Sequence, residues 1–179
     1  MHRLDSTVKK IQPPDKAAMD KATQRQDRLT KPRGSLGSLE RISIQIAGIT
    51  GKAIPQIKNK AIITMAADHG VVAQGVSLYP QEVTAQMVLN FLSGGAAINV
   101  LARQVGARVV IADMGVAVKL TACENIINKN IGPGTRDICM GPAMTREQAI
   151  ASLEAGIDIV EREMKQGLDI VGTGEMGIG

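Results

Sequence analysis

Hydrophobic and polar positions in the first fifty residues follow a helical period. After an irregular leader that ends at Pro13 and Pro14, Asp15 is a good N-cap for a helix that runs to about Leu29. Proline and glycine residues break the pattern over residues 31–37. A second helix is predicted from about residue 38, with three large apolar side chains on one face: Leu39, Ile42 and Ile46.

From residue 61 onward, apolar runs alternate with amphipathic segments. Residues 61–67 form a continuous apolar run, which is typical of a strand buried on both faces. Pro80 suits the first turn of a helix, whose apolar face carries Val83, Met87 and Phe91. After an interruption by two glycines, residues 96–105 predict another helix, and residues 107–112 predict a second strand that ends at Asp113.

The last third of the chain adds one more helix and one more strand. Residues 132–141 form a glycine-bearing loop, and Thr145 with Gln148 makes a capping box for a helix that ends near Lys165. Residues 168–171 predict a third strand. Strands separated by helices predict an α/β protein with a parallel sheet. Because such a strand usually lies inside a sheet, we expect the sheet, and therefore the chain, to be incomplete.

Composition and charge narrow the classes of partner. Tyr79 and Phe91 are the only aromatic residues, so the core is expected to be aliphatic. Residues 1–60 carry a formal charge of +8 and the remainder −4. A basic segment is compatible with nucleic acid, but these charges have helical spacing and no aromatic residues are available for base stacking. We therefore predict a solvated basic helix surface and no nucleic-acid partner.

Cysteine usage and hydropathy indicate a cytoplasmic protein. Cys123 and Cys139 lack the spacing of a redox pair, and no secretory signal precedes them. No run of eighteen apolar residues is present to span a bilayer, so no membrane partner is expected.

Candidate chemistry lies where the predicted strands end, because ligands of open parallel sheets bind at the carboxyl ends of the strands. The first strand is followed by Asp68 and His69, a carboxylate and an imidazole that suit acid–base work, metal binding or substrate positioning. For a single histidine, ordinary packing is the favoured interpretation, and no metal is expected because no second ligand has suitable spacing. Asp113 after the second strand is typical turn chemistry, with no catalytic role.

The third strand is followed by residues 172–177, which match the dinucleotide fingerprint G-x-G-x-x-G. That fingerprint requires a helix after the glycines, and only two residues follow Gly177. A nucleotide-dependent oxidoreductase is therefore disfavoured. Glu175 is either a proton acceptor or hydrogen-bond partner for a ligand, or a solvated side chain at a tight strand exit; the motif alone leaves both open.

Five motifs in order resemble one enzyme family. They are Lys31–Glu40, Ala66–Val71, Tyr79–Thr84, Gly141–Met144 and Gly172–Gly177. Together they are similar to nicotinate-nucleotide–dimethylbenzimidazole phosphoribosyltransferase, the CobT family of cobalamin synthesis. The resemblance implies transfer of phosphoribosyl from nicotinate mononucleotide to 5,6-dimethylbenzimidazole, giving α-ribazole 5'-phosphate and nicotinate, without a metal or organic cofactor.

The same resemblance implies an architecture and an assembly. Family members are homodimers with a Rossmann-like, three-layer α/β domain and a small helical domain built from both chain ends. Residues 1–37 are then an N-terminal helical segment and linker, and residues 38–179 are the N-terminal part of the phosphoribosyltransferase domain.

The resemblance also implies site residues. Glu175 matches an active-site glutamate of the family, and a carboxylate in an apolar pocket, with its pKa raised by desolvation, suits the removal of a proton from the base. Substrate-binding residues implied by the motifs are Asp68, Tyr79, Gln86, Met87, Gly174, Met176, Gly177 and Ile178. Of these, Tyr79, Gln86 and Met87 belong to or adjoin the segment that contacts the benzimidazole, while Met176 and Ile178 line its apolar side; which base is preferred stays open.

Length sets a final expectation. The family is about twice as long as this chain, and the glutamate usually assigned as general base lies in the part that is missing here. We therefore expect little or no transferase activity from these residues alone. The alternative is a non-catalytic module that binds a benzimidazole or a mononucleotide without turning it over.

Overall fold

The chain divides into two compact units, Met1–Ile57 and Lys58–Gly179. The computed structural model describes residues 2–120 and 125–179. The predicted boundary at residue 37 lies inside the first unit, because the helix that follows it packs on the helix that precedes it.

The first unit contains α1 (Arg3–Lys9), α2 (Lys16–Arg28) and α3 (Ser38–Thr50). The prediction of an irregular leader before Pro13 is wrong, because α1 lies within it. The predicted N-cap is confirmed, since the Asp15 carboxylate accepts a hydrogen bond from the Ala18 N–H at 3.0 Å. The two longer helices bury small residues where they meet: Ala18, Ala22, Ala47 and Gly48.

The prediction for the buried face of α3 is wrong. Leu39 is 64% exposed and Ile42 is also exposed, whereas the buried positions of the helix are Ala47 and Gly48. Gly48 explains the difference, because a Cβ there would lie 2.6 Å from Met19 Cγ of α2. Close approach of the two helices therefore selects the small residues, while Leu39 and Ile42 stay exposed and Ile46, the third predicted residue, is half-buried.

The second unit is built on a parallel sheet, as predicted. Its strands are β1 (Lys60–Ala67), β2 (Ala107–Gly115), β3 (Ile126–Asn128) and β4 (Ile170–Met176), in the order β3-β2-β1-β4. The second strand runs two residues past its predicted end at Asp113. The short strand β3 was not predicted, since three residues carry no readable periodicity.

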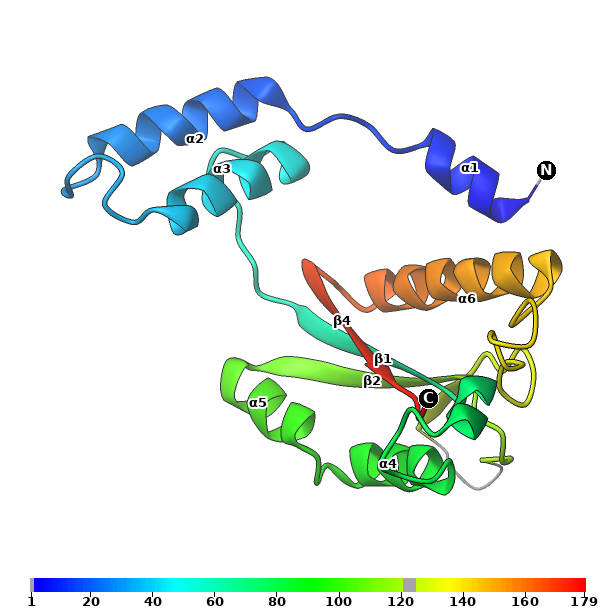
Figure 1. Cartoon of the computed structure of the whole chain (residues 1–179). Helices are drawn as coiled ribbons and strands as arrows, with labels where there is room; N and C mark the ends of the chain where they lie inside the picture. Colours follow the sequence, from blue (N-terminus) through cyan, green and yellow to red (C-terminus); the bar gives the residue numbers. More distant parts are fainter. Residues whose placement is uncertain (1, 121–124) are drawn as a thin grey trace. The chain divides into compact units, whose positions relative to one another are not determined.

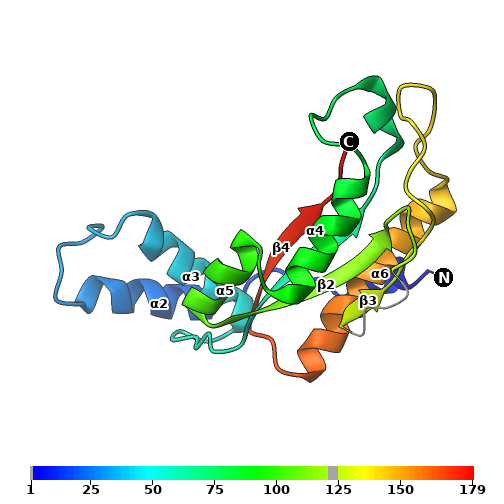
Figure 2. The same ribbon diagram turned by 90° about the horizontal axis from the view of Figure 1, so that it is seen from below.

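Helices cover both faces of this sheet, which makes the three layers (Figure 1, Figure 2). The short 3-10 turn η1 (Gly70–Gln74) follows β1, then α4 (Glu82–Ser93) and α5 (Ala97–Val105) pack on one face, and α6 (Arg146–Lys165) packs on the other. The capping box that opens α6 is confirmed, with the Thr145 N–H donating to the Gln148 side chain and the Gln148 N–H to the Thr145 hydroxyl.

Two apolar cores, aliphatic except for Phe91, lie between these layers. The α4/α5 side buries Ala66, Val88, Phe91, Ala96, Ile111 and Val116, and the α6 side buries Ile63, Ala112 and Ile159. The stretch Glu82–Val105 has the length and composition of a membrane-crossing helix. In this fold the stretch is divided into α4 and α5 by a left-handed glycine at Gly94, and both helices pack on the sheet.

Candidate functional site

The site is expected at one edge of the sheet, where all four parallel strands have their carboxyl ends. Strand β1 is central, with β2 on one side and β4 on the other, so the strand order reverses between β1 and β4. Ligands of open α/β sheets bind at such a reversal. The segments that meet there are Asp68–Gly70 after β1 and Gly177–Gly179 after β4.

The G-x-G-x-x-G motif lies in a different place from the one predicted. Residues 172–176 belong to β4 itself, and Gly172 and Gly174 are in register with Ile62 and Thr64 of β1. The prediction that the strand ends at residue 171 and that the glycines form a loop is therefore wrong. The glycine at 174 is required by packing, because a Cβ there would lie 2.9 Å from the buried Thr64 hydroxyl. Glycine weakens strands in general, so the sequence pattern did not indicate that the strand continues through Gly172 and Gly174.

The residues after β4 are clamped between β1 and α4. The Ile178 N–H donates to the Thr84 hydroxyl at 3.1 Å, and the Ile178 carbonyl accepts from the His69 N–H at 3.3 Å. Gly177 leaves no room for a side chain, because a Cβ would collide with the Ala67 carbonyl oxygen and approach His69 Nε2 within 2.8 Å. Thr84 is fully buried on α4. Sequence reasoning missed this hydroxyl, although its position one turn before Val88 on the apolar face was readable.

Asp68 is a buried carboxylate at the carboxyl end of β1. Its side chain is 2% exposed, and its Oδ2 accepts a hydrogen bond from the Ala117 N–H at 2.8 Å. Its main-chain carbonyl accepts from the Thr135 N–H at 3.0 Å, so the residue joins the exits of β1 and β2 to the glycine-bearing loop. Among the described atoms, Oδ1 has no hydrogen-bond partner. The residue therefore organises the strand ends, and its substrate-binding role stays a prediction.

An apolar wall forms on the α4 side of the sheet. Met87 of α4 and Met176 of β4 both pack against the same buried cluster, which includes Ala66 and Val88. Ile178 is also buried, and its N–H is bound to Thr84 of α4. The structure thus brings two of the predicted residues, Met87 and Met176, onto one cluster.

Glu175 lies on the opposite face of the strand. Side chains alternate along a strand, and Glu175 is in register with Met65, which packs on the α6 core around Ile159. The Glu175 side chain is exposed. The expected apolar pocket around this carboxylate is not formed by residues 2–120 and 125–179. The carboxylate and the apolar wall share only the strand end.

Two predicted base-contacting residues face solvent. Tyr79 is 63% exposed, in the segment before α4 where its N–H donates to the Ser77 hydroxyl at 3.1 Å. Gln86 is exposed on α4, away from the buried positions of that helix. Neither side chain belongs to the wall of Met87 and Met176, and their roles stay predictions.

Asp113 has the turn role predicted for it. Its Oδ1 accepts hydrogen bonds from the Gly115 N–H at 3.0 Å and the Val116 N–H at 2.9 Å, and the Asn130 amide donates to both of its oxygens. Next to this network lies a cavity of about 500 Å³. The residues that line the cavity are Asp113, Val116, Ala117, Lys119, Leu120, Asn128, Asn130 and Pro133.

The glycine-bearing loop covers the turn after β1. The Gly70 N–H donates to the Thr135 hydroxyl at 3.3 Å, and a Cβ on Gly70 would lie 2.6 Å from the Arg136 carbonyl carbon. The amide of Gln74 donates to Asp137, and this hydrogen bond, with that of the Cys139 N–H, holds the pKa of Asp137 below its ordinary value. No group of three His, Cys, Asp or Glu side chains suited to a metal ion occurs in the described part of the chain.

Comparisons with known proteins agree with this fold. A family model described as Phosphoribosyltransferase matches residues 11–179. The chain is 58% identical over 179 residues to a nicotinate-nucleotide–dimethylbenzimidazole phosphoribosyltransferase of Dehalococcoides mccartyi and 57% identical to one of Roseiflexus sp., covering 100% of this chain and 51% of each relative. The crystal structure of such an enzyme from Thermus thermophilus superimposes with a TM-score of 0.88 at 44% identity, covering 92% of this chain and 50% of that one.

The chain therefore spans about half the length of the curated relatives that it matches. The matched half includes all five motifs, from Lys31 to Gly177, and the three-layer α/β fold agrees with the solved structure. The chain belongs to the family of nicotinate-nucleotide–dimethylbenzimidazole phosphoribosyltransferases.

Proposed function

We propose that this chain forms the base-facing part of an enzyme that transfers phosphoribosyl from nicotinate mononucleotide to 5,6-dimethylbenzimidazole, giving α-ribazole 5'-phosphate and nicotinate. The observation that carries the proposal is the reversal point between β1 and β4, where Met87 and Met176 pack on one buried aliphatic cluster and the N–H of the buried Ile178 is bound to Thr84. In a protein with only two aromatic residues, such a wall is the surface that a flat benzimidazole can bury.

The proposed chemistry is a displacement at the ribose. A ring nitrogen of the benzimidazole attacks C1' of the ribose, the bond from C1' to the pyridine nitrogen breaks, and nicotinate leaves with the electron pair of that bond. The other ring nitrogen loses its proton to a carboxylate. Glu175 is the carboxylate that this chain offers at the end of β4; it is exposed on the face opposite the wall, so it can take this proton only from a base that extends past the strand end. Fixed dipoles and charges near the ribose would stabilise the positive charge that develops there.

We also propose that residues 1–179 form only part of the active site. Because the relatives are about twice as long, we infer that residues from outside this half supply the main general base and much of the phosphate site. We further propose that the whole protein is a cytoplasmic homodimer, and that residues 1–179 alone bind substrate better than they turn it over.

An activity assay and a binding titration test these statements. The 179-residue chain and a full-length relative are each incubated with both substrates, and α-ribazole phosphate is measured. Normal turnover by the 179-residue chain would contradict the proposed dependence on the other half. Titration calorimetry then measures binding of dimethylbenzimidazole and nicotinate mononucleotide separately. Binding without turnover would favour the alternative of a non-catalytic module if the full-length form of this protein were also inactive.

Variants of the apolar wall make the binding test specific. Met87→Ala removes part of the wall and should weaken dimethylbenzimidazole binding roughly tenfold, since several buried methylene-sized groups are lost. Met87→Leu nearly conserves volume and should bind like the unmodified chain. Leu89→Ala, on the exposed side of the same helix, is the matched control. Equal binding by Met87→Ala and Leu89→Ala would place the base elsewhere.

A further inference from the structure

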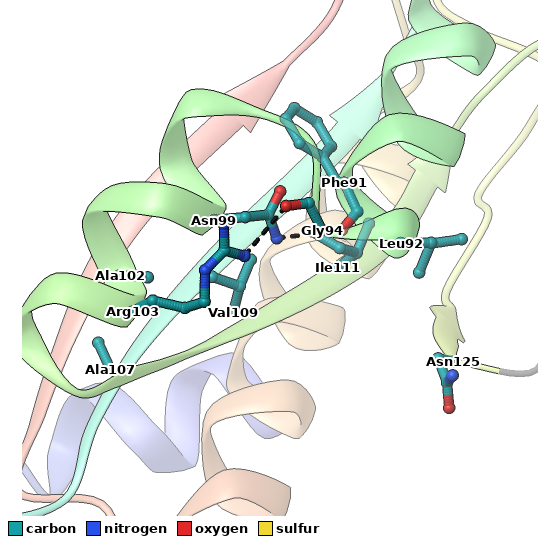
Figure 3. A pocket seen from close by; sticks show the side chains of 10 residues that line it. All are labelled: Phe91, Leu92, Gly94, Asn99, Ala102, Arg103, Ala107, Val109, Ile111 and Asn125. Carbon is teal, nitrogen blue, oxygen red and sulfur yellow. Dashed lines mark hydrogen bonds between the residues drawn. The ribbon is translucent and has the colours of Figure 1, made fainter.

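A second pocket lies under the turn between α4 and α5 (Figure 3). It has a volume of about 280 Å³ and is formed by the end of α4, by α5 and by strand β2. The residues that line it are Phe91, Leu92, Gly94, Asn99, Ala102, Arg103, Ala107, Val109, Ile111 and Asn125.

This pocket is separate from the candidate site at the strand ends. Its floor is made by Ala107, Val109 and Ile111. These residues lie in the amino-terminal half of β2, on one face of the strand. The candidate site instead follows the carboxyl ends of β1 and β4. None of Met87, Glu175, Met176 and Ile178 lines the second pocket.

Most residues of the walls and floor are apolar, although polar atoms make up about half of the lining surface. Phe91 and Leu92 of α4 and Ala102 of α5 stand over Val109 and Ile111 (Figure 3). The polar atoms of the Asn99 side chain already have partners. Its N–H₂ donates to the Phe91 carbonyl at 3.1 Å, and its oxygen accepts from the Ala96 N–H at 3.2 Å. A ring or short aliphatic group could therefore be buried here without leaving a polar group of Asn99 unpaired.

Arg103 supplies a positive charge at this pocket. Its Nη1 donates to the Gly94 carbonyl at 3.0 Å, which holds the guanidinium against the turn and over the hollow (Figure 3). Within residues 2–120 and 125–179, no Asp or Glu forms an ion pair with it. A guanidinium has five N–H donors in a planar fork that matches a carboxylate, so most of its donors are available to a ligand.

We propose that this pocket binds a small aromatic monocarboxylate, with the ring on Val109 and Ile111 and the carboxylate on Arg103. The volume of about 280 Å³ is just below the usual range of ligand pockets, which suits one ring and excludes a whole nucleotide. The inference goes beyond the proposed function and stands without it, although nicotinate, the product of the proposed reaction, belongs to this chemical class. Because Arg103 is exposed, affinity in the millimolar range is expected.

The test is a titration of the 179-residue chain followed by NMR, with isoleucine and valine methyl groups labelled. Sodium nicotinate is the probe, and nicotinamide is its neutral isostere. Nicotinate should shift the methyl signals of Val109 and Ile111 in a saturable way, and nicotinamide should bind roughly tenfold more weakly because it lacks the charge. Arg103→Gln should remove this difference, while Arg146→Gln, an exposed arginine on α6, should leave it unchanged.

A second variant keeps the test decisive if Arg103→Gln disturbs the turn. Val109→Phe fills the floor but retains the guanidinium, and it should abolish the saturable shifts at Ile111. Equal affinity for nicotinate and nicotinamide, no saturation by about 20 mM nicotinate, or unchanged binding by Val109→Phe would each overturn the proposal. A dimethylbenzimidazole titration that shifts Ile178 and not Val109 reports on the proposed function separately.

Discussion

The two units of the chain differ in the residues that hold them together. In Met1–Ile57 the helices meet through alanine and glycine, and large apolar side chains such as Leu39 and Ile49 remain exposed. In Lys58–Gly179 buried alanines are joined by large side chains, such as Ile63 and Ile159, on the two faces of the sheet. The difference teaches that an amphipathic pattern identifies a helix in both units, whereas the buried positions depend on packing: of the three residues predicted on the apolar face of α4, only Phe91 is buried.

The largest effect is expected in the core of the second unit. Ile159→Ala removes a side chain that is 1% exposed between α6 and the sheet, and should lower the free energy of unfolding by about 2–5 kcal/mol. Leu153→Ala, exposed on the same helix, should stay within about 0.5 kcal/mol. Urea unfolding followed by circular dichroism measures both. Similar losses in the free energy of unfolding for the two variants would show that the effect does not depend on burial.

The next effect concerns the helix contact of the first unit. Gly48→Leu places a side chain where Met19 and Pro14 already lie, so it should destabilise this unit by roughly 1–3 kcal/mol. Ile49→Leu, one residue later and exposed, should be nearly neutral. Thermal unfolding of each variant decides the matter. If Gly48→Leu were as stable as Ile49→Leu, close helix approach would not be what holds this unit together.

A smaller and more local effect is expected at Thr84. Thr84→Val keeps the shape of the side chain but leaves the buried Ile178 N–H without its acceptor, which should cost about 1–3 kcal/mol of local stability. Thr84→Ser keeps the hydroxyl and should therefore keep most of this local stability. Amide hydrogen exchange at Ile178 is the measurement. An amide that exchanges equally slowly in Thr84→Val would argue against the clamp.

The smallest effect is electrostatic and belongs to the first unit. The Lys31 ammonium, 2.6 Å from the Glu40 carboxylate, and the Leu36 N–H hold the pKa of Glu40 below its ordinary value. A folded-state pKa that is depressed gives stability above the unfolded-state pKa, and this stability is lost as pH falls through the folded-state pKa. Glu40→Gln should therefore be less stable than the unmodified chain near neutral pH, with the difference shrinking in acid.

Melting temperatures of the two proteins over a range of pH test this prediction. Asp27→Asn is a suitable control, because the Asp27 and Arg33 side chains are exposed and 4.0 Å apart. A difference between Glu40→Gln and the unmodified chain that stays constant with pH would mean that the ion pair does not contribute.

The sequence predicted most of the fold because its signals were strong. The Asp15 cap, the Thr145 capping box and the continuous apolar run of β1 each have one dominant physical cause, and all three are confirmed. The buried face of α3 and the three-residue β3 were missed. The first depends on how closely two helices approach, and the second on pairing with a strand that is distant along the chain, so neither cause is local.

The candidate site was predicted less well, for a related reason. Grouping Met87 with Met176 follows from the resemblance and agrees with their shared cluster. The face on which Glu175 lies could not be inferred, because it depends on β4 continuing through its glycines in register with β1. The Thr84 clamp joins residues 94 positions apart, and no local pattern predicts such a pair.

The glycine spacing of β4 has a consequence for motif searches. Gly172 and Gly174 are two residues apart, which is the period of side chains along a strand, so both bare positions lie on the face beside Ile62 and Thr64. Gly177 is glycine for the unrelated reason that the chain must pass the Ala67 carbonyl. Two independent steric demands, at Gly174 and Gly177, together with Gly172, where a Cβ would make only an ordinary contact at 3.5 Å from Ile62, produce the letters of a dinucleotide fingerprint. Any strand of a parallel sheet that needs glycines beside bulky side chains of its paired strand can produce the same false match.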